Sequence, residues 1–115
     1  MLCLVPTPIG NLEDISQRSL RILVEAELIF CEDTRVTKKL LNLLGERNNL
    51  DFSNKEYKSF HSHNEDKILK SLDKETFSKN VVYVSDAGMP CVSDPGATLV
   101  DYCIKNEIPY DVLPG

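Results

Sequence analysis

Short apolar runs alternate with amphipathic segments along the whole chain. Continuous apolar runs, which are typical of strands buried on both sides, occupy residues 2–5, 28–31 and 81–84. Residues 57–60 are a weaker strand candidate, and a fifth strand is predicted to start within residues 110–113. Segments with apolar residues at roughly helical spacing lie between them, at residues 13–25, 34–44, 64–74 and 98–106. Strands that alternate with helices predict βαβ units. We therefore predict an α/β fold whose sheet is five-stranded and mostly parallel, with helices on both faces.

Capping residues place the ends of the first two helices. Asn11 or Asp14 could be the N-cap at the start of the first helical segment, and Thr34 could be the N-cap at the start of the second. Gly45 follows the last apolar residue of the second stripe and predicts its C-terminal end. The polar stretch from residue 46 to 58 is then expected to be a loop.

Three polar bends directly follow strands, at residues 6–11, 32–35 and 85–96. The carboxyl ends of parallel strands meet at one edge of a sheet, and ligands of such sheets bind beyond that edge. We therefore expect the three bends to share one rim and to form the ligand site.

Composition limits the class of protein. The chain has 115 residues, of which 42% are hydrophobic, and a net charge of −5, which is typical of one soluble domain. An acidic domain is not a general nucleic-acid clamp, so any RNA contact requires a local basic patch or another part of the protein. No run is long enough to span a membrane. The four cysteines form no C-x-x-C pair and are expected to be free thiols in a reducing cytoplasm.

The first bend is stiff and is not a dinucleotide loop. Pro6 and Pro8 fix the backbone and remove two donors, while Gly10 permits a close approach by a ligand. The bend has one glycine where a G-x-G-x-x-G loop has three, which excludes a pyrophosphate cradle. A rigid connector between strand and helix is the alternative interpretation.

The second bend combines two carboxylates with an arginine. Glu32 and Asp33 end a strand, Arg35 begins a helix, and Lys38 and Lys39 extend the positive charge. Capping of the helix by Asp33 or Thr34, with an ordinary ion pair to Arg35, explains this pattern and is favoured over a functional role on sequence alone. In the functional interpretation, Arg35 binds a phosphate or carboxylate and one of the acids is a base or an orienting group.

The third bend repeats a Ser-Asp turn before its helix starts. A carboxylate at Asp86 can accept hydrogen bonds from ribose hydroxyls or an amine, and amides around Gly88 can bind a carboxylate. An amino-acid-like ligand with a ribose needs both kinds of partner. His61 and His63, two residues apart, are expected on opposite sides of an extended segment, so no metal site is predicted. A substrate-facing role for them stays open.

These motifs occur in an order that resembles a known family. They are Pro6-Thr7-Pro8-Ile9-Gly10-Asn11, Glu32-Asp33-Thr34-Arg35, His61 with His63-Asn64-Glu65, Ser85-Asp86-Ala87-Gly88-Met89-Pro90 and Leu113-Pro114-Gly115. Together they are similar to the ribosomal RNA small-subunit methyltransferase I family, a branch of the tetrapyrrole methylase superfamily. The resemblance implies an S-adenosylmethionine-dependent enzyme that methylates a cytidine ribose 2′-hydroxyl in 16S ribosomal RNA.

The resemblance also implies where the cofactor and the chemistry lie. The implied cofactor-binding residues are Pro8, Ile9, Gly10, Asp86, Gly88, Met89 and Pro90. Glu32 and Asp33 are candidate bases, and Arg35 is a candidate phosphate contact. The implied partner is 16S ribosomal RNA within the small ribosomal subunit. Because the chain is acidic, we expect most of the RNA contacts to come from a second domain or a homodimer partner.

Residues 1–115 are then expected to be the N-terminal α/β domain of a longer two-domain enzyme, inactive by itself, since the last strand ends on Pro-Gly with no helix after it. Three other functions stay open: a tetrapyrrole methylase of the same superfamily, a non-catalytic flavodoxin-like binding domain, and a magnesium-dependent phosphohydrolase. The last is disfavoured because no aspartate follows the first strand.

Overall fold

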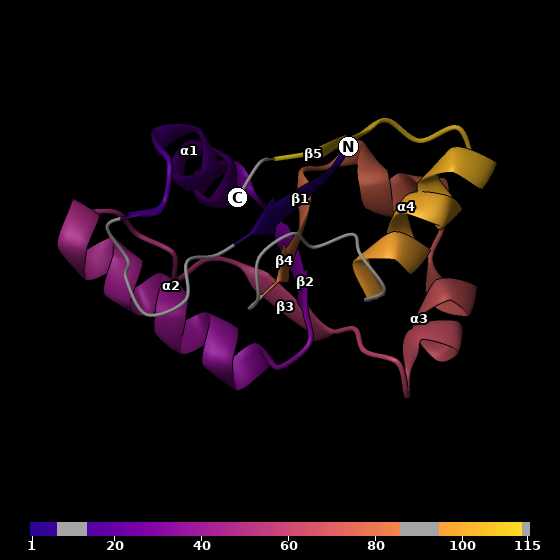
Figure 1. Ribbon diagram of the computed structural model, residues 1–115, viewed down its shortest axis with the longest axis horizontal. Helices are drawn as coiled ribbons and strands as arrows, with labels where there is room; N and C mark the ends of the chain where they lie inside the picture. The colour runs from indigo at the N-terminus through magenta and orange to yellow at the C-terminus, as the bar shows by residue number, and fades with distance from the viewer. Residues whose placement is uncertain (7–13, 86–94, 114–115) are drawn as a thin grey trace.

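A computed structural model describes residues 1–6, 14–85 and 95–113 (Figure 1). The predicted features at residues 7–13, 86–94 and 114–115 lie outside the described residues. Within them, five strands are present: β1 (Leu2–Pro6), β2 (Leu28–Cys31), β3 (Glu56–Ser59), β4 (Val81–Ser85) and β5 (Tyr110–Val112). The helices are α1 (Gln17–Glu25), α2 (Thr34–Asn48), α3 (Glu65–Ser71), the short 3₁₀ helix η2 (Lys74–Ser78) and α4 (Pro95–Lys105).

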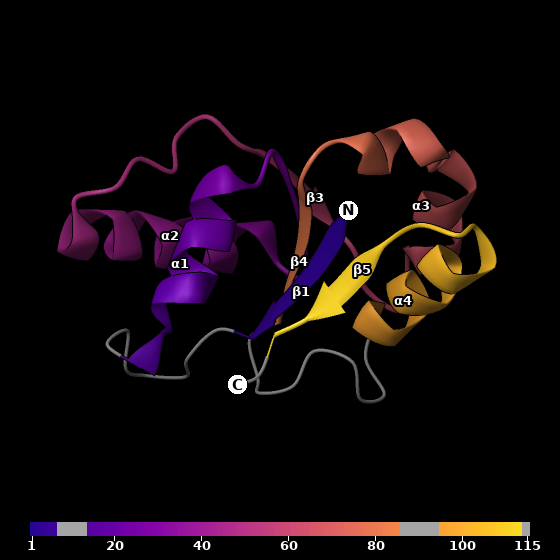
Figure 2. The same cartoon turned by 90° about the horizontal axis from the view of Figure 1, so that it is seen from above.

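The strands form one sheet in the order β3-β2-β4-β1-β5, and each of its four pairings is parallel. The α/β class and the five-stranded sheet predicted from the sequence are therefore confirmed. Figure 2 shows α1 and α2 on one side of this sheet and α3 and α4 on the other. Strand β4 runs in the same direction as both of its neighbours, which places all described strand ends on one edge.

Strict alternation along the strands fills two cores, one on each face of the sheet. Toward α1 and α2, the buried strand residues are Val5, Ile29, Cys31, Val82 and Val84. Toward α3 and α4, they are Leu2, Leu4, Leu28, Phe30, Val81 and Tyr83. Burial on both faces explains why β1, β2 and β4 read as continuous apolar runs rather than as alternating ones.

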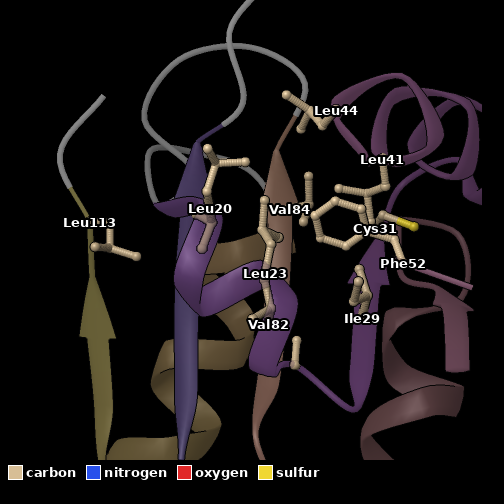
Figure 3. Packing of buried hydrophobic residues seen from close by; sticks show 12 residues of the cluster. Leu20, Leu23, Ile29, Cys31, Leu41, Leu44, Phe52, Val82, Val84 and Leu113 are labelled. Atoms are coloured by element: carbon tan, nitrogen blue, oxygen red, sulfur yellow. The ribbon is translucent and has the colours of Figure 1, made fainter. Parts of the chain in front are cut away.

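Figure 3 shows the core under α1 and α2, where Leu20 and Leu23 of α1 and Leu41 and Leu44 of α2 point toward the sheet. The spacing of these leucines matches the helical period that the sequence displays. Phe52, from the chain between α2 and β3, closes this core at the side of α2.

The predicted N-cap of α1 is wrong, whereas α2 is capped by one of its two candidate residues. Ser16 caps α1, with its Oγ accepting the backbone N–H of Ser19 at 3.0 Å, where Asn11 or Asp14 was expected. Asp33, not Thr34, caps α2, because its carboxylate accepts the N–H of Arg35 at 2.9 Å. In each case the residue with extended backbone just before the helix makes the cap.

The C-terminal end predicted at Gly45 is also wrong. Helix α2 continues to Asn48 and ends at Asn49, which takes the left-handed conformation with φ 55°. The N–H of Leu50 then bonds to the Gly45 carbonyl at 2.9 Å. Gly45 is required by this return of the chain, since a Cβ there would lie 2.6 Å from the Leu50 oxygen. The predicted loop is shorter as a result and ends where β3 begins.

Two further boundaries differ from the predicted ranges. Helix α3 ends at Ser71 rather than at residue 74, since η2 begins at Lys74 with Asp73 as its cap. Helix α4 begins at Pro95, a residue whose fixed φ suits the first turn of a helix. Cys3 and Cys103 are free thiols, Cys31 is buried in β2, and Cys91 lies outside the described residues. No described helix combines the length and the apolar character that a membrane span requires.

Candidate functional site at the carboxyl edge of the sheet

Neighbouring strands end together at one edge. Pro6 at the end of β1 pairs with Ser85 at the end of β4. Cys31 of β2 pairs with Val84 on one side and with Ser59 of β3 on the other. The strands that precede the three polar bends therefore end side by side, in agreement with the shared rim that the sequence predicts.

The helices that follow β1 and β4 lie on opposite faces of the sheet. The connection after β1 leads to α1 on one face, and the connection after β4 leads to α4 on the other (Figure 2). In folds of this kind, two adjacent parallel strands whose connections separate in this way mark the position, beyond their carboxyl ends, where a ligand crevice is expected. The crevice is a topological property, because it follows from strand order and crossover hand rather than from any single side chain.

The predicted cofactor residues flank this position along the sequence. Pro8, Ile9 and Gly10 come shortly after Pro6, and Asp86 with the rest of its bend comes directly after Ser85. These residues lie outside the described residues, so their part in cofactor binding stays a prediction. What the structure contributes is the pairing of Pro6 with Ser85, from which both segments start.

Asp33 has a defined structural task at the rim. Its carboxylate caps α2 and lies 3.6 Å from the Nε of Arg35. The hydrogen bond from the Arg35 backbone lowers the pKa of Asp33 below its usual range, and the Val36 backbone and the Arg35 charge act in the same direction. A carboxylate stabilised in its charged form is a weaker proton acceptor, which favours the structural role for Asp33 over the role of a general base.

Arg35 and Glu32 are directed to solvent rather than to the core. The Arg35 side chain is 92% exposed, so its contact with Asp33 is a surface ion pair of small energetic value. Glu32 is exposed as well. Lys38 lies with its Nζ 5.2 Å from the centre of the Tyr57 ring, which places one cation of α2 over strand β3.

The two histidines occupy a closed turn beyond β3, not an extended segment. Asn64 holds the turn, since its Oδ1 accepts the His61 N–H at 2.8 Å and its Nδ2 donates to the Ser59 carbonyl at 3.0 Å. The imidazole rings of His61 and His63 meet edge to face at 5.9 Å. The expectation of opposite sides is therefore wrong, because the turn folds the two side chains together. The described residues contain no cluster of three metal-ligating side chains.

The sequence does not predict that the hydroxyl groups of Ser85 and Thr37, near the carboxyl edge of the sheet, are buried. Ser85 is only 5% exposed at the end of β4, next to the crevice. Thr37, in the first turn of α2, is fully buried, and its Oγ1 has no hydrogen-bond partner in the part of the chain that the structure describes. A buried hydroxyl without a partner costs free energy. Nothing in the local pattern around Thr37 distinguishes it from an ordinary helical position.

A second hollow lies away from this edge. It has a volume of about 220 Å³ and is lined by Cys3, Arg18, Asn80 and Asp111 among others, on the α1 side of β1 and β5. The Arg18 guanidinium closes on Asp111 at 2.7 Å. Asn80 and Met1 precede their strands, so this hollow reaches the amino edge and does not contribute to the candidate site.

The fold defines a class: a doubly wound α/β fold in which β1 and β4 mark the expected ligand position at the carboxyl edge of the sheet. Comparison with known proteins makes the class specific. The family model for tetrapyrrole (corrin/porphyrin) methylases matches residues 1–115. The chain belongs to the tetrapyrrole methylase family.

Relatives and solved structures agree with this membership. The chain is 51% identical over 116 residues to the ribosomal RNA small subunit methyltransferase I of Campylobacter fetus, covering all of this chain and 43% of that protein. It is 46% identical to the Thermotoga maritima protein of the same name, over 99% of this chain and 49% of the other. The chain therefore spans less than half the length of these relatives.

Among solved structures, a uroporphyrin-III C-methyltransferase from Thermus thermophilus shares the fold with a TM-score of 0.67 at 20% identity, over 99% of this chain and 48% of the other. A second structure of that kind, solved with S-adenosylhomocysteine, gives a TM-score of 0.64 at 21% identity, over 99% of this chain and 47% of the other. At these identities the likeness bears on the fold alone.

Proposed function

We propose that this chain is the cofactor-binding half of an S-adenosylmethionine-dependent methyltransferase whose substrate is the 2′-hydroxyl of a cytidine ribose in 16S ribosomal RNA. The observation that carries the proposal is the 51% identity, across the whole chain, to a ribosomal RNA small subunit methyltransferase I. The crevice between β1 and β4, with the two predicted cofactor bends starting at paired residues, is consistent with it.

The position where β1 and β4 end side by side suits an adenosyl amino acid. The crevice lies where parallel sheets bind nucleotide-like ligands. The buried Ser85 ends β4 there, directly before the carboxylate of Asp86. We infer that Asp86, Gly88, Met89 and Pro90 on one side, and Pro8, Ile9 and Gly10 on the other, hold the cofactor.

The residues at the carboxyl edge of the sheet have to supply only part of the chemistry. S-adenosylmethionine supplies an activated methyl group, so the protein has mainly to align the ribose oxygen and accept its proton. Arg35, exposed at the start of α2, is suited to bind a phosphate of the RNA. Of the two candidate bases, Glu32 is exposed and makes no capping bond in the described structure, whereas Asp33 is engaged as a cap. We therefore favour Glu32 as the proton acceptor of this chain.

The activity requires the remainder of the protein. Because the chain spans 43% of the Campylobacter fetus relative, we propose that it is the N-terminal domain of a two-domain enzyme and that this domain alone does not transfer methyl groups. A second domain would close the crevice from the side that β1 and β4 leave open. We infer a cytoplasmic location, because the proposed substrate is on the ribosome.

A methyl-transfer assay tests the function. The full-length protein is incubated with labelled S-adenosylmethionine and small ribosomal subunits that lack the modification, and the methylated nucleotide is identified by mass spectrometry. We expect label in a 2′-O-methylcytidine of 16S ribosomal RNA. Label in a uroporphyrinogen offered in parallel, with none in RNA, would instead support a tetrapyrrole methylase. Failure to bind S-adenosylhomocysteine in calorimetry would contradict both.

A further inference from the structure

We propose that the ends of β2 and β3 carry a contact surface for the phosphodiester backbone of the RNA substrate. It consists of Arg35, Lys38 and Lys39 on α2 and of His61 in the turn after β3. We call these four residues the phosphate rim. The proposal rests on the proposed function, because it names the surface of this domain that the RNA touches.

The two parts of the phosphate rim leave the sheet side by side. Cys31 and Ser59 are paired at the ends of β2 and β3, and the N–H of Phe60 donates to the Cys31 carbonyl at 2.7 Å. The turn into α2 and the turn into α3 therefore start from adjacent strands on the same edge. Strand β2 also pairs with β4, so the phosphate rim lies one strand away from the crevice between β4 and β1.

The charge of the phosphate rim differs from that of the domain. The chain has a net charge of −5, yet three cations fall within five residues at the start of α2. From residue 32 to 39, these three cations outnumber the carboxylates of Glu32 and Asp33, and Asp33 is already engaged as the helix cap. Lysine and arginine contacts to phosphates supply most of the affinity in protein–nucleic acid complexes, so a local excess of this kind marks a docking surface.

The cations of α2 are accessible. Arg35 has 92% of its side chain exposed, and Lys39 is exposed one turn further along the same face of the helix. Lys39 makes no ion pair within the described residues, and Lys38 is held over the Tyr57 ring rather than by a carboxylate. These side chains are available to phosphate groups without the loss of a buried interaction.

His61 adds a donor with a fixed direction. Its Nδ1 accepts the backbone N–H of His63 at 3.2 Å, so in the neutral ring the proton lies on Nε2. The described structure gives Nε2 no hydrogen-bond partner. The turn is closed by Asn64 without any contribution from Nε2. A donor that the fold orients but does not use is suited to a phosphate oxygen, which is an acceptor.

The test measures RNA binding directly. Binding of a fluorescent fragment of unmodified 16S ribosomal RNA to the full-length protein is followed by anisotropy over a range of KCl concentrations. The rim variant is Arg35→Gln with Lys39→Gln. The matched control is Lys74→Gln with Lys105→Gln, which removes the same charge from exposed positions at the opposite edge of the sheet. Calorimetry with S-adenosylhomocysteine is run on every variant.

We expect the rim variant to bind the RNA at least tenfold more weakly than the control variant. The slope of log affinity against log salt should become shallower by about 1.5, because each phosphate contact contributes about 0.7–0.9 to it. S-adenosylhomocysteine affinity should stay unchanged in both variants. Equal affinity and equal slope in the rim and control variants would overturn the proposal.

Two substitutions separate the roles of the His61 nitrogens. In His61→Asn, the amide oxygen can still accept the His63 N–H, but no donor remains at the Nε2 position. In His61→Gln, the amide nitrogen keeps a donor near that position. We expect His61→Asn to bind the RNA about tenfold more weakly than the wild type, and His61→Gln to lose less RNA affinity than that. The two variants should have equal melting temperatures. A loss in both variants that follows their melting temperatures would contradict a contact through Nε2.

The outcomes distinguish this proposal from the proposed function. A wild-type protein that binds the RNA fragment through the phosphate rim but transfers no methyl group would contradict the proposed function alone. A wild-type protein that methylates the RNA, with rim and control variants equally active and equally tight, would contradict the phosphate rim alone.

Discussion

At the scale of single residues, the structure separates side chains that hold the fold from side chains that are available for chemistry. Asp33 was a candidate base by sequence, and the structure shows it as the cap of α2 with a pKa held low by backbone hydrogen bonds. Glu32, one residue earlier, has no such task in the described structure. Sequence alone could not choose between them, because a cap and a base require the same carboxylate.

The two roles of Asp33 predict different results for Asn and Ala. Asn caps a helix as well as Asp does, whereas Ala loses about 1 kcal/mol. If Asp33 acts only as a cap, Asp33→Asn should keep both the free energy of unfolding and the methyl-transfer rate, while Asp33→Ala should lower the free energy of unfolding. Urea titration and single-turnover methyl transfer measure the two quantities. A large loss of rate in a stable Asp33→Asn variant would restore Asp33 as the base.

The cap also has a pH dependence with a definite sign. A carboxylate whose pKa is lowered by folding stabilises the native state above its ordinary pKa, and this contribution is lost as pH falls through the lower native value. The stability of Asp33→Asn should therefore fall less steeply than that of the wild type as pH falls below about 4.

The Thr37 hydroxyl offers a second test at this scale. Its Oγ1 is buried without a partner among the described residues, so the native state carries an uncompensated desolvation cost. We expect Thr37→Val, which keeps the shape and removes the hydroxyl, to raise the free energy of unfolding by about 1 kcal/mol. Thr37→Ser, which keeps the hydroxyl, is the control. A destabilised Thr37→Val variant would show that the hydroxyl has a partner in solution.

At the scale of elements, helix α2 shows how a local pattern and a tertiary contact compete. Its apolar stripe predicts a helix correctly, yet the same pattern predicts the end of that helix at Gly45. The helix instead continues for three more residues, because Leu50 turns back over Gly45 and Asn49 supplies the left-handed residue. A glycine needed for close approach cannot be distinguished from a C-cap glycine without knowledge of the contact.

Gly45→Ala tests that contact against helix propensity. Alanine in a helix interior is favoured over glycine by about 1 kcal/mol. A Cβ at this position, however, would lie 2.6 Å from the Leu50 carbonyl oxygen and 3.2 Å from the Phe52 ring. Overpacking typically costs about 1–3 kcal/mol, so we expect Gly45→Ala to be net destabilising. Asn42→Ala, at an exposed position of α2, is the control and should be neutral or slightly stabilising. A stabilised Gly45→Ala variant would contradict the close approach.

At the scale of the whole molecule, burial on both faces of the sheet protects groups that would react in an unfolded chain. Cys31 is buried in β2, and Cys103 in α4 is buried against the other face of the sheet. Burial raises the pKa of Cys103 to about 11 from the ordinary 9.0. Its thiolate, which is the reactive form, is therefore scarce near neutral pH.

Thiol labelling measures this protection. In the folded protein at pH 8, we expect Cys31 and Cys103 to react with iodoacetamide only through global unfolding, while Cys3, which is half-buried, reacts faster. Peptide mapping by mass spectrometry gives the rate at each cysteine, and labelling in urea is the control. Since the native pKa of Cys103 is raised, stability should also decline as pH increases from 9 toward 11. Rapid labelling of Cys103 in native buffer would contradict its burial in the core.

The sequence by itself determined the class of fold, the strands and the common edge from which the three polar bends start. It could do so because apolar periodicity and strand–helix alternation are local properties of the chain, and parallel strands bring their ends to one edge whatever the details. Tertiary structure alone decided the strand order that places β1 beside β4, the extension of α2 past Gly45, and the turn that folds His61 against His63. Those features depend on contacts between residues far apart in the chain or on a turn closed by side chains, and no local pattern records such contacts.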